Sequence, residues 1–451
     1  MRGAFYSPKV LVSDLVKDVS SADNVLDPSC GDGAFLVALA QRVKTELSED
    51  AFVGYLNTKL FGVDVDPVAV AGATAALTSL APDGAVLDGL RAHLKVGDAL
   101  WTPRFVWDAE FPGVLFDVVL GNPPWAQVVS HKNYSEEHKQ RIKDFLQFLN
   151  DENGKSNGEY KRSASCPKFN LFDLFLQRAM QLARSRILMI IPKTFMGNVQ
   201  QTETRKMLFQ NFPIHSIRVF GQRETSAAFP GVTGTASLVL NALRAQPPTT
   251  LALSTGCSLS NLSGSRRVDL PYTIFVPPYY SIPMVEDTDL DFLAAASQLP
   301  ARIGNYVESH TGFKPSAAFL EGLVSKPTEG YLPLYKGCNI TGPYALSNDV
   351  DRYYDPATVP APVAALAGQR RIAMKHVCTF SEIDSIRTCA VVFEPGMMAD
   401  DSVYFYVPND PTHTEPLLEV LNSPASDRYL RFFTEKNLPQ ALVKSIPCNT
   451  L

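Results

Sequence analysis

The sequence has no paired cysteines of the kind that bind zinc, no long apolar run and no excess of positive charge. Its seven cysteines are scattered and never spaced as Cys-x-x-Cys, which argues against both a zinc site and a disulfide framework. No apolar segment approaches the roughly 20 residues that a membrane-spanning helix needs, and the first residues lack the apolar core of a secretory signal. We therefore expect a cytoplasmic protein with no membrane contact and no metal.

The charge balance is not typical of a nucleic-acid-binding protein. The formal net charge is −5 at pH 7. Up to residue 245 the chain has 26 Lys and Arg against 25 Asp and Glu, and beyond it 15 against 21. Neither part is basic, so any contact with DNA has to come from a local patch.

The most informative stretch is 116–125, Phe-Asp-Val-Val-Leu-Gly-Asn-Pro-Pro-Trp. Its apolar run predicts a buried strand, which ends at the prolines because they lack an amide hydrogen for the ladder. The Asn122 side-chain oxygen and the Pro123 carbonyl can both accept from one NH2 group, and Trp125 offers a flat face to a ring. This fits an exocyclic amine on adenine or cytosine; the alternative is a plain strand end with Trp125 in the core.

Three strands predicted upstream each end in acidic residues. The strand at 24–27 runs into a Gly-x-Gly turn and a helix at 34–44, an arrangement that lets a ligand approach the backbone. Strands at 60–66 and 94–98 follow. Carboxylates at such ends can bind a cation, an amine or ribose hydroxyls, although each alone is more often a helix cap. The acids concerned are Asp27, Asp64, Asp66 and Asp98.

Other local patterns complete the expected layout. Ser7 and Pro8 predict a helix start, as N-cap and first helical residue. The polar stretch 131–165 predicts a helix of about a dozen residues and a loop, which either closes over DNA or is a solvated insertion. The remaining predictions are a helix at 168–183, a strand at 187–191, and a loop leading into a strand over 223–240.

In chain order, these segments resemble motifs X, I, II, III and IV of the S-adenosylmethionine-dependent amino-methyltransferases of DNA: Tyr6-Ser7-Pro8, the loop 27–33, the segment 62–67, Gly97-Asp98-Ala99-Leu100 and 121–125. Because the cofactor motifs come first, the chain resembles the gamma-class, TaqI-like adenine-N6 enzymes of restriction-modification systems. The resemblance implies a Rossmann-like methyltransferase sheet with helices on both faces over 1–245, a transition at 246–290, and a mixed α+β target-recognition domain over 291–451.

The resemblance also implies residue roles in transferring a methyl group to the N6 amine of an adenine flipped out of double-stranded DNA. The catalytic residues would be Asn122, Pro123, Trp125 and Phe229, where Phe229 stacks on the base opposite Trp125 or, alternatively, packs in the core. Asp66 competes with Asp64 for the ribose hydroxyls. The residues expected to bind S-adenosylmethionine are Tyr6, Ser7, Asp27, Gly31, Gly33, Asp64, Asp98 and Ala99.

Several alternatives stay open. One is a cytosine-N4 enzyme, and another is a methyltransferase for guanine in ribosomal RNA or for a protein glutamine, although the long C-terminal part argues against the compact glutamine enzymes. A DNA- or cofactor-binding subunit without catalysis is disfavoured by the intact Asn122 and acids. The resemblance implies a prokaryotic, cytoplasmic setting and leaves open a separate cognate restriction endonuclease and the oligomeric state.

Overall fold

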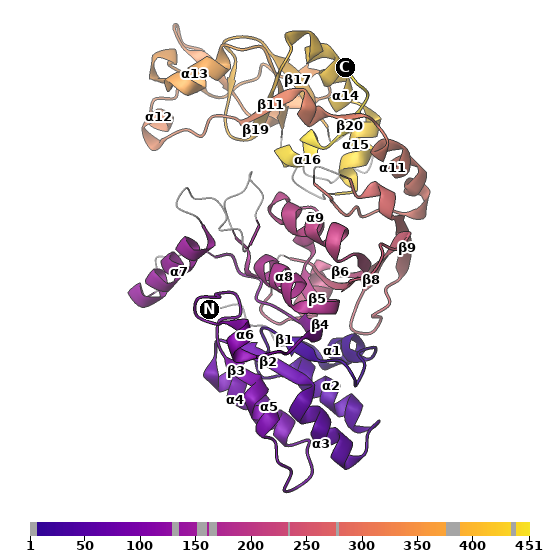
Figure 1. Cartoon of the computed structure of the whole chain (residues 1–451). Coiled ribbons are helices and arrows are strands. Elements are labelled where there is room, and N and C mark those ends of the chain that lie inside the picture. The colour runs from indigo at the N-terminus through magenta and orange to yellow at the C-terminus, as the bar shows by residue number, and fades with distance from the viewer. Residues whose placement is uncertain are drawn as a thin grey trace. The chain divides into compact units, whose positions relative to one another are not determined.

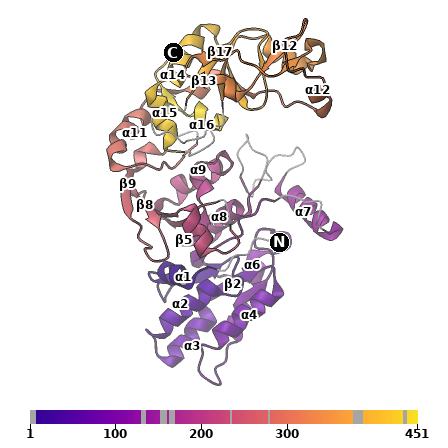
Figure 2. The same ribbon diagram turned by 180° about the vertical axis from the view of Figure 1, so that it is seen from behind.

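The computed structural model describes residues 7–128, 135–150, 160–161, 169–232, 235–276, 279–375, 388–433 and 439–451. The chain divides into two compact units, Met1–Ser281 and Ile282–Leu451, which Figures 1 and 2 show from opposite sides. Tyr6 and the parts 131–134, 151–159 and 162–165 of the polar stretch lie outside the described residues. Within those residues, no helix is both long and apolar enough to cross a bilayer.

A nine-stranded sheet lies at the centre of the described part of the first unit, in the order β3-β2-β1-β4-β5-β7-β6-β8-β9. β1 pairs in parallel with β2 and with β4, whereas β7 runs antiparallel to both of its neighbours. The order therefore reverses between β1 and β4, where ligands bind in open α/β sheets. The strands are β1 (Val25–Asp27), β2 (Leu60–Asp64), β3 (Leu94–Val96), β4 (Phe116–Gly121), β5 (Ala183–Pro192), β6 (Ile214–Phe220), β7 (Ser237–Leu243), β8 (Thr250–Cys257) and β9 (Arg266–Pro271).

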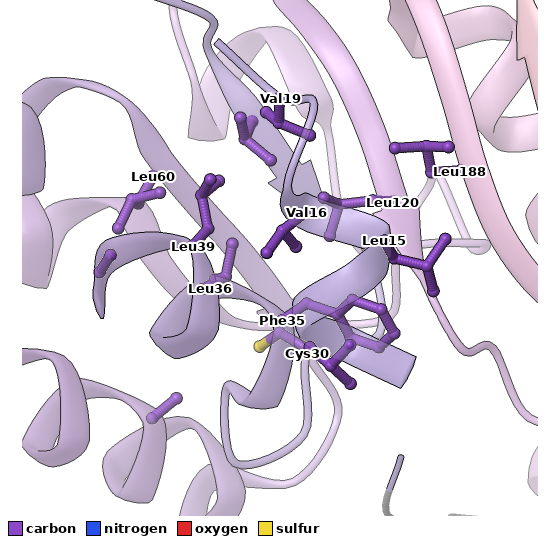
Figure 3. Packing of buried hydrophobic residues seen from close by; sticks show 14 of the residues in the cluster. Leu15, Val16, Val19, Cys30, Phe35, Leu36, Leu39, Leu60, Leu120 and Leu188 are labelled. Atoms are coloured by element: carbon purple, nitrogen blue, oxygen red, sulfur yellow. The ribbon is translucent and has the colours of Figure 1, made fainter. Parts of the chain in front are cut away.

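Helices cover both faces of this sheet, as predicted. Figure 3 shows one face, where Leu15 and Leu36 pack with Leu120 and Leu188. Val119 precedes Leu120 in the strand and points to the opposite face of the sheet, because alternate residues of a strand do so. Val119 is also fully buried, so the second face is covered as well. The helices are α1 (Lys9–Val16), α2 (Ala34–Lys44), α3 (Glu49–Thr58), α4 (Pro67–Thr78), α5 (Asp88–His93), α6 (Trp107–Glu110), α7 (Glu136–Leu149), α8 (Leu171–Leu182), α9 (Thr202–Asn211) and α10 (Gln222–Ala228).

The predicted transition at 246–290 is wrong in its first half, because β8 and β9 belong to the sheet. Leu251 and Leu253 alternate with less buried residues, as do Val268 and Leu270, which is the pattern of a half-buried strand. The proline-, serine- and threonine-rich composition predicted a linker here, whereas the alternation of buried and less buried residues indicates strands. The first unit instead ends at Ser281.

Two local predictions also need correction. Ser7 does not cap α1 with its side chain; Pro8 precedes the helix, which begins at Lys9. The segment expected as a loop from 223 contains α10, and Phe229 directly follows this helix. The helix expected within 131–165 is confirmed as α7.

The second unit combines short helices with four sheets in its described part, which confirms the predicted mixed α+β class. Its largest sheet has the antiparallel order β11-β19-β16-β17. Ile372 and Met374 of this sheet pack with Leu417 and Leu421 of α14 in a buried core. The elements are β10 (Ala301–Arg302), β11 (Val307–Thr311), β12 (Leu332–Tyr335), β13 (Ile340–Gly342), β14 (Ala345–Leu346), β15 (Tyr353–Tyr354), β16 (Arg371–Lys375), β17 (Ala390–Phe393), β18 (Met398–Ala399), β19 (Val403–Pro408), β20 (Pro447–Cys448), α11 (Leu290–Ser297), α12 (Ala317–Glu321), α13 (Ala361–Ala367), α14 (Thr414–Leu421), α15 (Pro424–Arg431) and α16 (Gln440–Lys444).

Candidate functional site

The carboxyl ends of four adjacent parallel strands carry the polar residues predicted as the site. Asp27 and Asp64 are the last residues of β1 and β2, and Asn122 directly follows β4. Asp98 lies two residues beyond β3, and the preceding Gly97 N–H donates to the backbone carbonyl of Asp64 (2.8 Å). Because these strands are neighbours around the reversal between β1 and β4, the four side chains share one edge of the sheet.

Asp27 lies at the most enclosed point of this edge and is only 1% exposed. Its Oδ1 accepts from the Ser29 N–H (3.0 Å) and lies 2.7 Å from where a Cβ on Gly121 would stand. Burial raises the pKa of Asp27 to about 8, and the nearby charge of Asp64 contributes in the same direction. The carboxyl is therefore mostly neutral at pH 7, and a bound cation beside it would favour its ionised form.

The turn after β1 depends on two glycines in left-handed conformations. Gly31 has φ +53° and Gly33 has φ +86°. A Cβ on Gly33 would come within 2.9 Å of the Ala73 Cβ in α4, so this glycine lets the turn and the helix approach closely. A Cβ on Gly31 would meet no atom within 4 Å, which leaves open space above the turn.

The two acids after β2 differ in what they bind. The Asp64 carboxylate accepts from the backbone N–H of Gly31 (2.9 Å) and of Asp66 (3.0 Å), and so connects the β1 turn to the β2 end. Asp66 instead accepts from the Val68 N–H (2.9 Å) and caps α4. Asp66 thus has the cap role that the sequence left as its alternative.

Asp98 has a partner that sequence reasoning missed. Its Oδ1 accepts from the Leu100 N–H (3.3 Å), and its Oδ2 pairs with Nη2 of Arg141 in α7 (3.3 Å). Ala99, predicted with it as a cofactor residue, is buried. Val65, which lies between Asp64 and Asp66 at the end of β2, is a large apolar side chain that is 43% exposed.

The Asn122 amide is held by two side chains. Its Nδ2 donates to Ser7 Oγ (3.1 Å), and its Oδ1 accepts from the Trp125 indole Nε1–H (3.1 Å). Pro123, next in the chain, is buried. The two hydrogen bonds fix which end of the amide faces each neighbour, and they bring Ser7 to Asn122 across 115 residues of sequence.

Trp125 and Phe229 contact each other. Their ring centroids are 5.3 Å apart at an interplanar angle of 65°, an edge-to-face arrangement, and Phe229 is 1% exposed. A base stacked between two parallel rings needs a separation of about 7 Å, twice the contact distance of carbon atoms. Stacking of a base between these rings, as predicted, therefore requires them to separate.

Two neighbouring arginines of the second unit, Arg370 and Arg371, have partners within that unit. Arg371 is 1% exposed and donates to backbone carbonyls, including that of Met397 (2.6 Å). Arg370 pairs with Glu394 (3.1 Å) and Glu415 (2.7 Å). Neither guanidinium is available to a phosphate without breaking these bonds.

Comparison with known proteins gives a family match and a fold. Residues 58–225 match the sequence profile of the Eco57I restriction-modification methylase family. A Type II methyltransferase of Thermus thermophilus is 27% identical over 202 residues, which are 43% of this chain and 35% of that protein. The chain thus spans about a third of the length of this curated relative.

Among solved structures, the Type IIL restriction-modification enzyme MmeI in complex with DNA has a TM-score of 0.54 at 11% identity, over 98% of this chain and 63% of that one. A modification subunit of a putative type I restriction enzyme from Vibrio vulnificus YJ016 has a TM-score of 0.40 at 19% identity, over 56% of this chain and 47% of that one. The likeness to MmeI is a likeness of fold, and it extends through both units.

Replacing Gly121 tests the packing between β1 and β4. Gly121→Ala places a methyl group against Asp27 at φ +149°, so we expect the free energy of unfolding to fall by about 1–3 kcal/mol in urea titrations. The matched control is Gly54→Ala in α3, where a Cβ meets nothing within 4 Å. We expect that change to stabilise the chain by about 0.5–1 kcal/mol. Equal stability of the two variants would refute the constraint at Gly121.

Asp27 should make stability depend on pH. The native carboxyl keeps its proton to about pH 8, whereas in the unfolded chain it loses it near about pH 4. Stability from this group is thus complete below about pH 4 and is lost as pH rises to about 8, by up to about 1.4 kcal/mol per unit. Relative to Asp27→Asn, the wild type should lose free energy of unfolding between pH 5 and 8. Parallel curves of unfolding free energy against pH for the two proteins would contradict this prediction. Asp173, whose pKa is raised to about 7, adds the same pH dependence to both proteins and cancels in the comparison.

Proposed function

We propose that this chain is an S-adenosylmethionine-dependent methyltransferase of a restriction-modification system, and that it methylates the N6 amine of adenine in double-stranded DNA. The observation that carries the proposal is the shared edge of β1, β2, β3 and β4, where Asp27, Asp64, Asp98 and Asn122 meet at the reversal of strand order. The family match supports it, because residues 58–225 include three of these four strands.

The residues at the edge fit the proposed cofactor. The open space above Gly31 admits a ligand against the backbone, and the desolvated Asp27 carboxyl suits the cationic methionine end. Asp64 would accept from ribose hydroxyls and Asp98 from the adenine amine, while Val65 offers an exposed apolar face to the ring. When bound, the cofactor supplies an electrophilic methyl group on a sulfonium.

Asn122 and Pro123 would act on the target amine. The lone pair of an adenine N6 is delocalised into the ring, so the amine is a weak nucleophile. Acceptance of both amine hydrogens by Asn122 Oδ1 and the Pro123 carbonyl would localise that lone pair on nitrogen. Catalysis is then mostly orientation and electrostatics, for which positioning alone contributes about 7–11 kcal/mol. Ser7 and the Trp125 indole would keep the Asn122 amide from rotating.

The target base has to leave the duplex to reach this pocket. Flipping costs a few kcal/mol, which stacking on aromatic rings partly offsets. Trp125 and Phe229 are the rings proposed for stacking, and they would have to part to admit a base because they now touch. We further propose that the second unit recognises the DNA sequence.

Asn122→Ala tests the chemistry. We expect kcat for methyl transfer to DNA to fall by about 100-fold or more, because one of the two amine acceptors is lost, with S-adenosylmethionine binding nearly unchanged. Asn211→Ala, at the exposed end of α9, is the control and should behave as wild type. Base-resolution mapping of methylation in DNA from expressing cells would identify the target. Detection of methylated cytosine instead of methylated adenine would show that cytosine is the target base. Undiminished activity of Asn122→Ala would show that Asn122 takes no part in the reaction.

Asp64→Ala and Asp66→Ala separate the two acids after β2. We expect Asp64→Ala to raise the Kd for S-adenosylmethionine about 10- to 100-fold in calorimetry, because hydrogen bonds to a charged acceptor are lost. Asp66→Ala removes the α4 cap, so it should lower the free energy of unfolding by about 1 kcal/mol and leave Kd unchanged. The reverse outcome would assign the cofactor role to Asp66.

A further inference from the structure

The loop of residues 98–101, between β3 and α6, is held by segments that follow Asn122 in the chain. The first of these contacts is the ion pair between Asp98 and Arg141 of α7 (3.3 Å). The Arg141 side chain is 47% exposed, so this pair alone contributes little. It places α7 directly over the 98–101 loop.

The second contact is aromatic. Trp101 is 6% exposed, and its ring lies 5.5 Å from Phe145 and 6.2 Å from Phe148, both on α7. The Arg104 guanidinium lies 4.1 Å from the centre of the same indole. The apolar face of α7 is therefore docked on the last residue of the 98–101 loop, and this burial is a larger source of binding energy than the exposed ion pair.

The third contact is a buried hydrogen-bond chain. The Tyr160 hydroxyl donates to the Leu100 carbonyl (2.8 Å) and accepts from Nε (3.0 Å) and Nη2 (2.6 Å) of Arg178 in α8. Tyr160 is fully buried and Arg178 is 5% exposed. Hydrogen bonds from a charged donor in such a site are stronger than neutral ones, so the phenol is held firmly on the loop carbonyl.

The backbone beside Tyr160 is fixed as well. Gln177 of α8 accepts from the Lys161 N–H and donates to the Lys161 carbonyl, both at 2.7 Å. Gln177 is fully buried and also donates to Thr204 (2.9 Å). The chain at 160–161 is thus attached to α8, and α8 packs on β4 and β5 of the sheet.

We propose that Tyr160, supported by Arg178, and the aromatic face of α7 are positioning elements for the adenine end of the cofactor. They hold the 98–101 loop in the conformation that presents Asp98 at the strand edge. The inference rests on the proposed function, which assigns Asp98 to the adenine amine. A loop that is already ordered does not have to lose conformational freedom when the ligand binds, so affinity rises. Helix α7 and Tyr160, which follow the Asn-Pro-Pro-Trp motif in the chain, thereby gain a role in cofactor binding.

Tyr160→Phe tests the proposal by removing one hydroxyl while keeping the ring. We expect the Kd for S-adenosylmethionine, and that for adenosine, to rise by the same factor of about ten, because the change acts at the end the two ligands share. Tyr272→Phe is the matched control: this phenol also donates to a backbone carbonyl, that of Ile214 (2.8 Å), in the same unit but away from the 98–101 loop. The Tyr272→Phe variant should bind S-adenosylmethionine and adenosine with the Kd values of the wild type, even though its Tm falls.

Two further variants make the outcome decisive. Phe145→Ala loosens α7 from Trp101 without changing the buried hydrogen bonds of Tyr160, so it should also raise both Kd values. This variant tests the proposal if Tyr160→Phe does not fold. Wild-type affinity in both variants, together with a raised Kd in Asp98→Asn, would overturn the inference and leave the proposed function standing. Wild-type affinity in Asp98→Asn as well would show that the cofactor assignment itself is wrong.

Discussion

The packing of the Asp27 carboxyl beneath Gly121 is the constraint on which the rest of the site depends. It joins the ends of β1 and β4, the two strands between which the strand order reverses, and only a residue without a side chain fits above the carboxyl. Asn122 follows immediately, so the polar amide leaves the sheet over a desolvated, mostly neutral acid. One close approach therefore brings the buried acid and the candidate catalytic amide into the same small volume.

Much of the first unit follows from patterns that are local in the sequence. Apolar runs ending in acids or prolines predicted β1 to β4, and a glycine turn and helical spacing predicted α2 and α8, because each pattern reflects backbone geometry over a few residues. The gathering of Asp27, Asp64, Asp98 and Asn122 also followed, since parallel neighbouring strands put their carboxyl ends together. Composition was a poorer guide than alternation, and β8 and β9 were missed for that reason.

The contacts that could not be predicted join residues far apart in the sequence. Tyr160 contacts Leu100 across 60 residues of sequence, and Arg141 contacts Asp98 across 43. The residues around each partner contain no pattern that predicts these contacts. The same holds for Ser7, whose small hydroxyl suits a helix cap equally well but lies on Asn122. The sequence around Arg371 likewise does not indicate that its guanidinium donates to backbone carbonyls inside the second unit.

The edge-to-face pair of Trp125 and Phe229 has a consequence for the protein at rest. A permanently open slot wide enough for a nucleobase would be an apolar void, and voids of that kind destabilise a fold in proportion to their volume. With Trp125 and Phe229 in contact, the chain keeps a dense interior at this point. Under the proposed function, room for a base would form only when the two rings part, and the close packing that a stable interior requires would be kept at all other times.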